Sequence, residues 1–166
     1  MTRLRLLLAS ILLAVALPAA AGSWTDYLEN KLIDFLFRGQ TFSPPATLYV
    51  GLLTAACSDS SAGTEVSGGS YARVAVGSSL ANWAGTQSAG STTASSGTGG
   101  TTSNNAAITF PSPTANWGSV THFAIWDASS GGNQWLCQAL TTAKTVNNGD
   151  AAPSFAGGAL TIQADN

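Results

Sequence analysis

The sequence predicts an all-β protein with one N-terminal helix, an antiparallel β-sandwich of the jelly-roll or immunoglobulin-like kind, preceded by an apolar N-terminal segment. Two observations lead to this prediction. Residues 23–38 have the spacing of apolar side chains that is typical of a helix, and no second stretch has it convincingly. After Pro44 and Pro45 the apolar residues form short runs bounded by Gly, Pro, Asn and Ser. Strands that follow one another through turns favour antiparallel pairing over a βαβ fold.

Residues 1–21 have the composition of a secretory signal peptide or of a retained apolar arm. Arg3 and Arg5 precede an apolar run that ends in three alanines, Ala19 to Ala21, which resemble a cleavage site. The run is shorter than the roughly 20 residues that a membrane-spanning helix needs. Cleavage would predict export to the periplasm or the exterior, whereas a retained segment predicts an arm buried in an oligomer. Residues 22–166 are long enough for a single domain with one core.

The helix predicted at residues 23–38 has more apolar surface than one small sandwich can cover. Trp24, Leu28, Leu32 and Phe35 recur at intervals of four and three residues. Further apolar side chains extend beyond this stripe, namely Tyr27, Ile33, Leu36 and Phe37. Because an uncovered apolar patch usually marks an interface, we predict that copies of the chain, or another protein, contact the helix at or near Trp24, Leu28, Leu32 and Phe35.

The sandwich is predicted between residues 46 and 164. Its strands are expected in the runs TLYVGLLT, YARVAVG, AAITF, SVTHFAIWD, QWLCQAL and ALTIQ. Residues 84–105 contain no charged, aromatic or large aliphatic side chain, and they predict a flexible Ser/Thr/Gly loop. The two cysteines, Cys57 and Cys137, are too few for a disulfide framework and lack metal-ligand spacing. They form either one disulfide or two small buried side chains.

The stretch SVTHFAIWD contains the one histidine of the chain, His122, five residues before Asp127. On a strand these two side chains point to opposite faces, so they cannot form the hydrogen-bonded pair that orients a catalytic histidine. One face is expected to hold Val120, His122, Ala124 and Trp126, and the other Thr121, Phe123, Ile125 and Asp127. We therefore interpret His122 as a buried or interface residue.

The sequence also argues against several classes of function. It has no G-x-S-x-G, H-E-x-x-H or P-loop motif, and no glycine-rich strand-to-helix turn. Its formal net charge is −2 and only 8% of its residues are charged, so no basic stripe is available for nucleic acid. We predict no enzyme, no catalytic residue, no cofactor and no metal site.

Three motifs in fixed order, ITFP, WGSVTHFAIWDA and ALTTAKTV, resemble a family of small tailed-bacteriophage virion proteins, labelled tail fibre or minor tail proteins. The resemblance covers most of residues 27–162, apart from the Ser/Thr/Gly loop. It implies a non-enzymatic structural subunit of the virion, with a helix before a sandwich-like body. It also implies copies of itself and other virion proteins as partners. The apolar N-terminus departs from typical members, which begin near the equivalent of Tyr27.

Two alternatives remain open beside a tail fibre or minor tail component. A capsid decoration (cement) protein would have the same size and architecture. An exported, phage-derived carbohydrate-binding or adhesive module would instead bind host-surface glycans, with exposed aromatic side chains stacked on sugar rings. The candidates for such stacking are Trp83, Trp117 and Trp135.

Overall fold

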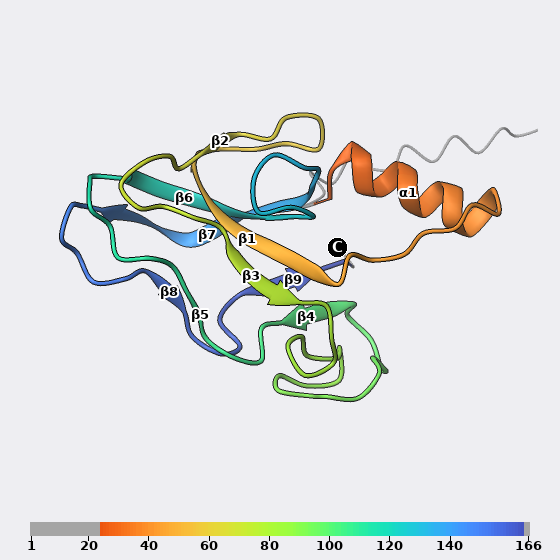
Figure 1. Cartoon of the computed structure of the whole chain (residues 1–166). Coiled ribbons are helices and arrows are strands. Elements are labelled where there is room, and N and C mark those ends of the chain that lie inside the picture. The colour runs from red at the N-terminus through yellow and green to blue at the C-terminus, as the bar shows by residue number, and fades with distance from the viewer. Residues whose placement is uncertain (1–23, 165–166) are drawn as a thin grey trace, which may run out of the picture.

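The computed structural model describes residues 24–164, where one five-stranded antiparallel sheet is faced by two short ribbons (Figure 1). The sheet has the order β2-β1-β6-β7, with β3 also paired to β1; its strands are β1 (Thr47–Ala55), β2 (Thr64–Glu65), β3 (Val74–Gly77), β6 (Gly118–Trp126) and β7 (Gln134–Val146). The ribbons pair β4 (Thr101–Ser103) with β9 (Thr161–Gln163), and β5 (Ile108–Thr109) with β8 (Ser154–Phe155). The predicted all-β antiparallel fold with one N-terminal helix is confirmed, and its second layer consists of these ribbons.

The main core lies between the sheet and the ribbons. The sheet contributes Val50 and Leu52 from β1 and Phe123 and Ile125 from β6, and the opposite layer contributes Ile108, Phe110, Leu160 and Ile162. Burying one such side chain stabilises the fold by about 1.5–3 kcal/mol. A smaller cluster covers the other face of the sheet, with Leu53, Ala124, Trp126 and Cys137. Because β1 and β6 are covered on both faces, they appear in the sequence as nearly continuous apolar runs.

Strands β6 and β7 pair irregularly at two places. The first lies between Val120 and His122, and here the predicted alternation of faces is wrong: Val120 lies in the main core with Phe123 and Ile125. At the second, Ile125 faces Leu136 while Trp126 faces Gln134, so Trp135 is an extra residue in β7. Such a β-bulge turns the backbone of the extra residue out of the regular ladder.

The segment predicted as a flexible loop, residues 84–105, is partly built into the body. Its end forms strand β4, and Asn104 is buried, where its side-chain amide donates to the backbone oxygens of Ala106 and Ala156 at 2.8 Å each. Within the loop the Gln87 side chain hydrogen-bonds to Ser91, Thr93, Ala94 and Ser96. Hydrogen bonds from polar side chains replace the apolar contacts that the segment lacks.

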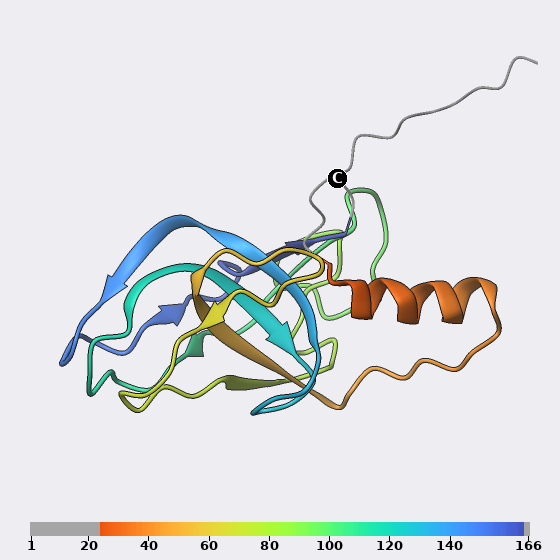
Figure 2. The same ribbon diagram turned by 90° about the horizontal axis from the view of Figure 1, so that it is seen from above.

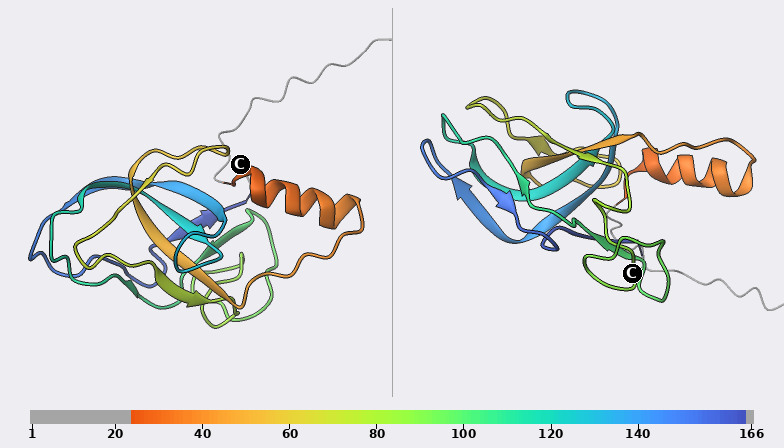
Figure 3. Two further views of the ribbon diagram at one scale, coloured as in Figure 1. Left: turned by 45° about the horizontal axis from the view of Figure 1, so that its top comes forward. Right: turned by 60° about the horizontal axis from the view of Figure 1, so that its bottom comes forward.

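Helix α1 (Asp26–Phe37) projects from one end of the body, and the chain returns from its tip to β1 (Figures 2 and 3). It is shorter than the predicted helix at residues 23–38. The described part of the chain contains no helix that is long and apolar enough to cross a membrane. The signal peptide or arm predicted at residues 1–21 lies outside the described residues.

Candidate assembly surface

The base of α1 is held by two segments of the body. The backbone N–H of Thr25 donates to the backbone oxygen of Trp135 at 3.0 Å, at the bulge of β7, and the Thr25 hydroxyl donates to the backbone oxygen of Gln134 at 2.6 Å. The N–H of Asp26 donates to the backbone oxygen of Asp59 at 3.0 Å. Thr25 is also the N-cap of α1, because its hydroxyl accepts a hydrogen bond from the N–H of Leu28 at 3.5 Å. The first turn is therefore fixed on the sheet.

The far half of α1 presents an apolar tip, which we define as Ile33, Phe35, Leu36 and Phe37. Their exposed fractions are 49%, 50%, 64% and 81%, in that order. Such exposure is unusual for four large apolar side chains within five consecutive residues, since soluble monomers seldom leave contiguous apolar patches in water. The tip is the strongest candidate for a contact with another protein.

The four residues predicted at the interface differ in how far the body of the protein covers them. Leu28 is buried against its own chain, and Trp24 is half-buried and forms an isolated bridge with Leu136. Leu28 is therefore not available to a partner. Leu32 is half-buried and Phe35 belongs to the exposed tip. Helical periodicity identified the apolar stripe, but where the body covers it depends on the attachment at Thr25.

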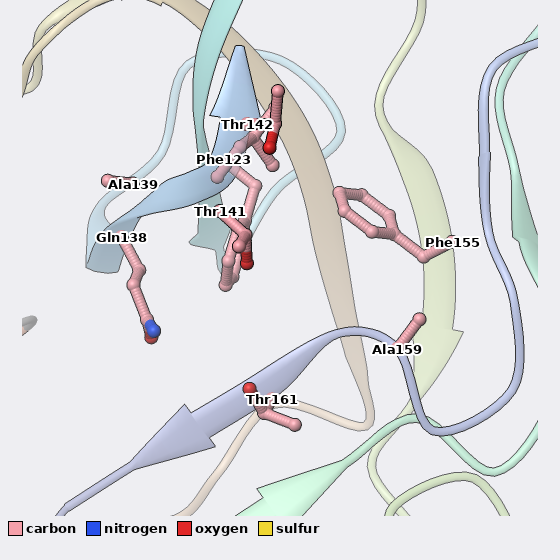
Figure 4. Close-up of a pocket in the computed structure, with 9 residues that line it drawn as sticks. Phe123, Gln138, Ala139, Thr141, Thr142, Phe155, Ala159 and Thr161 are labelled. Carbon is pink, nitrogen blue, oxygen red and sulfur yellow. The ribbon is translucent and has the colours of Figure 1, made fainter. Parts of the chain in front are cut away.

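A groove lies between β7 and β8. Strand β8 and the end of β7 lie at the end of the body opposite α1 (Figures 1 and 2). It has two adjoining parts that share Leu140 and Phe155. The apolar part has a volume of about 220 Å³ and is lined by Leu52, Phe110, Val120, Leu140, Lys144, Val146, Pro153, Ser154 and Phe155. The more polar part has a volume of about 310 Å³ and is lined by Phe123, Gln138, Ala139, Leu140, Thr141, Thr142, Phe155, Ala159 and Thr161 (Figure 4). No motif in the sequence indicated this groove.

A group of hydrogen-bonded polar side chains is built around Arg73. Its guanidinium donates to both carboxylate oxygens of Glu65 at 2.7 Å, and to the backbone oxygens of Ala128 and Gly131 at 2.7 and 2.8 Å. It also stacks on Trp126, 3.9 Å from the ring centroid. All these contacts lie within the protein and hold the turn between β6 and β7, so we assign this group a structural role.

Tyr71 completes this group. Its hydroxyl donates to Glu65 at 2.9 Å and accepts from the N–H of Leu52 at 2.8 Å. Burial, together with the nearby Glu65 carboxylate, raises the pKa of the Tyr71 hydroxyl far above its usual range. The phenol therefore stays neutral and cannot act as a base at neutral pH.

His122 and Asp127 lie in separate environments. The Nδ1 atom of His122 is 2.8 Å from the Thr121 hydroxyl. The Asp127 carboxylate accepts hydrogen bonds from the backbone and side chain of Asn133 at 2.7 and 2.8 Å. Burial raises the pKa of Asp127, but the hydrogen bonds from Asn133 outweigh it and the pKa falls below its ordinary value. Asp127 thus acts as a turn residue, and residues 24–164 contain no cluster of three His, Cys, Asp or Glu that could hold a metal ion.

The cysteines and tryptophans singled out in the sequence lie in the body. A disulfide joins Cys57 and Cys137, which are 80 residues apart in sequence and 6.4 Å apart between Cα atoms. Trp117 is buried and its indole N–H donates to the backbone oxygen of Gly69 at 3.0 Å, so its ring is not accessible for stacking on a sugar. Trp83 and Trp135 are half-buried, and Trp135 packs on Phe42 with ring centroids 5.5 Å apart.

We compared the chain with known proteins to find the family to which it belongs. No curated protein matches the chain. The family model described as "Podophage GP4 fiber I protein gp80" matches residues 23–163, a range that includes α1, the sheet and both ribbons. The chain therefore belongs to the podophage GP4 fiber I protein gp80 family and is a structural component of a bacteriophage virion.

Proposed function

We propose that the chain is a non-enzymatic subunit of a phage tail fibre and that it joins other copies of itself through the apolar tip of α1. The observation that carries the proposal is the exposure of Ile33, Phe35, Leu36 and Phe37 on a helix that projects from the body. The family description, a fibre protein, supports a fibre over a minor tail component or a capsid decoration protein. Residues 22–166 form the subunit as one domain.

The energy available at the tip is modest. Covering the exposed parts of the four side chains would contribute about 4–7 kcal/mol, at about 1.5–3 kcal/mol for each fully buried side chain. Association costs at least about 4 kcal/mol in lost freedom of motion. Self-association through the tip alone is therefore weak and depends on concentration, and it strengthens where many copies are held together in a particle.

Sedimentation equilibrium over a range of concentrations tests the self-association. The wild type should gain mass with concentration, and Leu36→Asp should stay monomeric because a charge then lies in the contact. Asn30→Asp is the matched control, since it adds the same charge at an exposed position of α1 outside the tip. A wild type that is monomeric at every concentration would refute the self-association.

Immunogold labelling of virions tests the location. Antibodies against the body should label the fibres of the tail. Label on the head shell would instead favour the capsid decoration protein, and label on the tail tube would favour the minor tail component.

A further inference from the structure

We infer that the more polar part of the groove between β7 and β8 is a binding site for a neutral sugar. A hexose ring would pack on Phe155 and place its hydroxyl groups on Gln138 and Thr161, which all line this part of the groove. The inference goes beyond the proposed function, because it does not depend on how copies of the chain associate. The sequence indicated three other aromatic residues for sugar stacking, and none of them lines this site: Trp83, Trp117 and Trp135.

The lining of the site has polar groups but no charged side chain. Its polar side chains are one amide and three hydroxyls, from Gln138, Thr141, Thr142 and Thr161. Each of these groups can both donate and accept hydrogen bonds, as the hydroxyl groups of a sugar do. Phosphates and carboxylates are bound more strongly by cationic side chains, which this lining lacks. The chemistry of the site therefore favours a neutral ligand that carries several hydroxyl groups.

Gln138 has a hydrogen-bonding group that the described part of the chain leaves unused. Its Oε1 atom is buried and has no hydrogen-bond partner among residues 24–164. Such a group lowers stability, and native proteins contain few of them. The side chain extends toward Thr161 of β9 (Figure 4). A half-turn of the amide exchanges its oxygen and nitrogen, so it can offer an acceptor or a donor to the groove. A sugar hydroxyl between Gln138 and Thr161 would provide the partner.

Phe155 lies on the side of the site opposite Gln138 (Figure 4). It is half-buried, and its ring packs edge-to-face on Phe123 and Phe110, with centroids 5.8 and 6.2 Å apart. Two aromatic contacts of this kind hold the ring in place before a ligand binds, so that binding costs little additional ordering. The face of a hexose ring that carries C–H groups is apolar and would pack on Phe155.

The size of the site suits one sugar ring. Its volume is about 310 Å³, at the lower end of the range of about 300–1,000 Å³ that is typical of ligand sites. An apolar cavity of about 150 Å³ accepts benzene. A hexose in its pyranose form has as many ring atoms as benzene, and its hydroxyl groups need additional room. The ligand efficiency of small molecules then gives a dissociation constant of about 1 mM for a methyl hexoside.

Nuclear magnetic resonance titration of the full chain tests the binding. The probes are the methyl glycosides of glucose, galactose and mannose. At least one of them should shift the backbone amide signals of residues 138–142 and 154–161. Two comparison compounds separate the contributions: cyclohexanol has a ring without the set of hydroxyl groups, and sorbitol has the hydroxyl groups without a ring. Both should bind about 10-fold more weakly than the hexoside, because each loses one kind of contact.

Variants at the site test the role of each side chain. Gln138→Leu and Thr161→Val remove one polar group each at nearly constant volume, and each should weaken binding about 2–10-fold. Phe155→Leu should have an effect of similar size, because it removes the flat ring. Thr145→Val is the matched control, since Thr145 is an exposed threonine of β7 that lines neither part of the groove. It should bind the hexoside as the wild type does.

Thermal melting separates a binding role of Gln138 from a structural one. Because Oε1 has no partner among the described residues, Gln138→Leu should melt at the temperature of the wild type or above it while it binds the hexoside more weakly. A lower melting temperature with unchanged binding would show a structural role and refute the assignment of Gln138.

Three results would overturn the sugar site: no shift with any hexoside at about 20 mM, well above the expected dissociation constant; shifts confined to other residues; or cyclohexanol that binds as tightly as the hexoside. The substitutions leave α1 unchanged, and sedimentation without sugar measures the self-association separately. Failure of the sugar site therefore leaves the proposed function standing, and failure of the self-association leaves the sugar site standing.

Discussion

Replacing Arg73 with alanine should destabilise the protein by about 3–4 kcal/mol. The Arg73 side chain is 7% exposed and its partner Glu65 is 28% exposed, so the substitution leaves a poorly hydrated carboxylate without its cation. Removing one member of a buried ion pair costs about 3–5 kcal/mol, and water access to Glu65 places this pair near the lower limit. The lost stacking on Trp126 adds up to about 1 kcal/mol.

Thermal denaturation followed by circular dichroism tests this value. About 2–4 °C is expected for each kcal/mol in a chain of this size, so the midpoint should fall by roughly 6–16 °C. The matched control is Arg38→Ala, which breaks the ion pair with Asp34 on the helix, where the side chains are 70% and 36% exposed. An exposed pair of this kind contributes at most about 1 kcal/mol. Equal effects of the two substitutions would refute the structural role of Arg73.

Three further effects should be measurable. Breaking the disulfide with Cys57→Ser and Cys137→Ser should lower the free energy of unfolding in urea by about 3–5 kcal/mol, because the bond closes a long loop; unchanged stability under reducing and oxidising conditions would contradict this. Gly51→Ala should cost about 1–3 kcal/mol, since the new methyl carbon would lie 2.6 Å from the ring of Trp126, and a normal melting temperature would show that the ring can move. The pKa of Asp127 is lowered in the folded protein, so the ionised carboxylate stabilises the fold above the ordinary aspartate pKa, and this stabilisation is lost as the pH falls through the pKa of the folded state. The stability of Asp127→Asn should therefore depend less on pH than that of the wild type between about pH 5 and pH 2.

The elements that could be predicted from the sequence are those whose burial is simple. Strands β1 and β6 are covered on both faces, so their apolar runs were visible without knowledge of their neighbours. Strands β2 and β8 contain two residues each, too few to show any periodicity. The second half of β7 is polar and largely exposed, with no alternation, so the predicted strand ended at Leu140.

The candidate site was predictable only in part. An excess of apolar residues on the helix indicated an interface. Which part of the helix is buried against the body and which part is exposed depends on a bulge at Trp135, and no local sequence pattern predicts that bulge. Arg73 and Glu65 pair because a turn brings together residues that are eight positions apart in the sequence. The guanidinium of Arg73 also stacks on the ring of Trp126 from β6. The groove is formed by β7 and β8. These two strands lie beside each other only in the folded chain, so the sequence pattern did not predict the groove.

The disulfide has a mechanical consequence for the far end of α1. Cys57 lies two residues before Asp59, and Cys137 lies two residues after Trp135, and the backbone oxygens of Asp59 and Trp135 hold the base of the helix. The bond thus ties the two supports of the helix to each other. A helix of 12 residues is about 18 Å long, so a tilt of about 10° at its base moves its tip by about 3 Å, nearly the thickness of a phenyl ring. The disulfide therefore limits how far the base of α1 can tilt, and with it the range of positions that Phe37 can take.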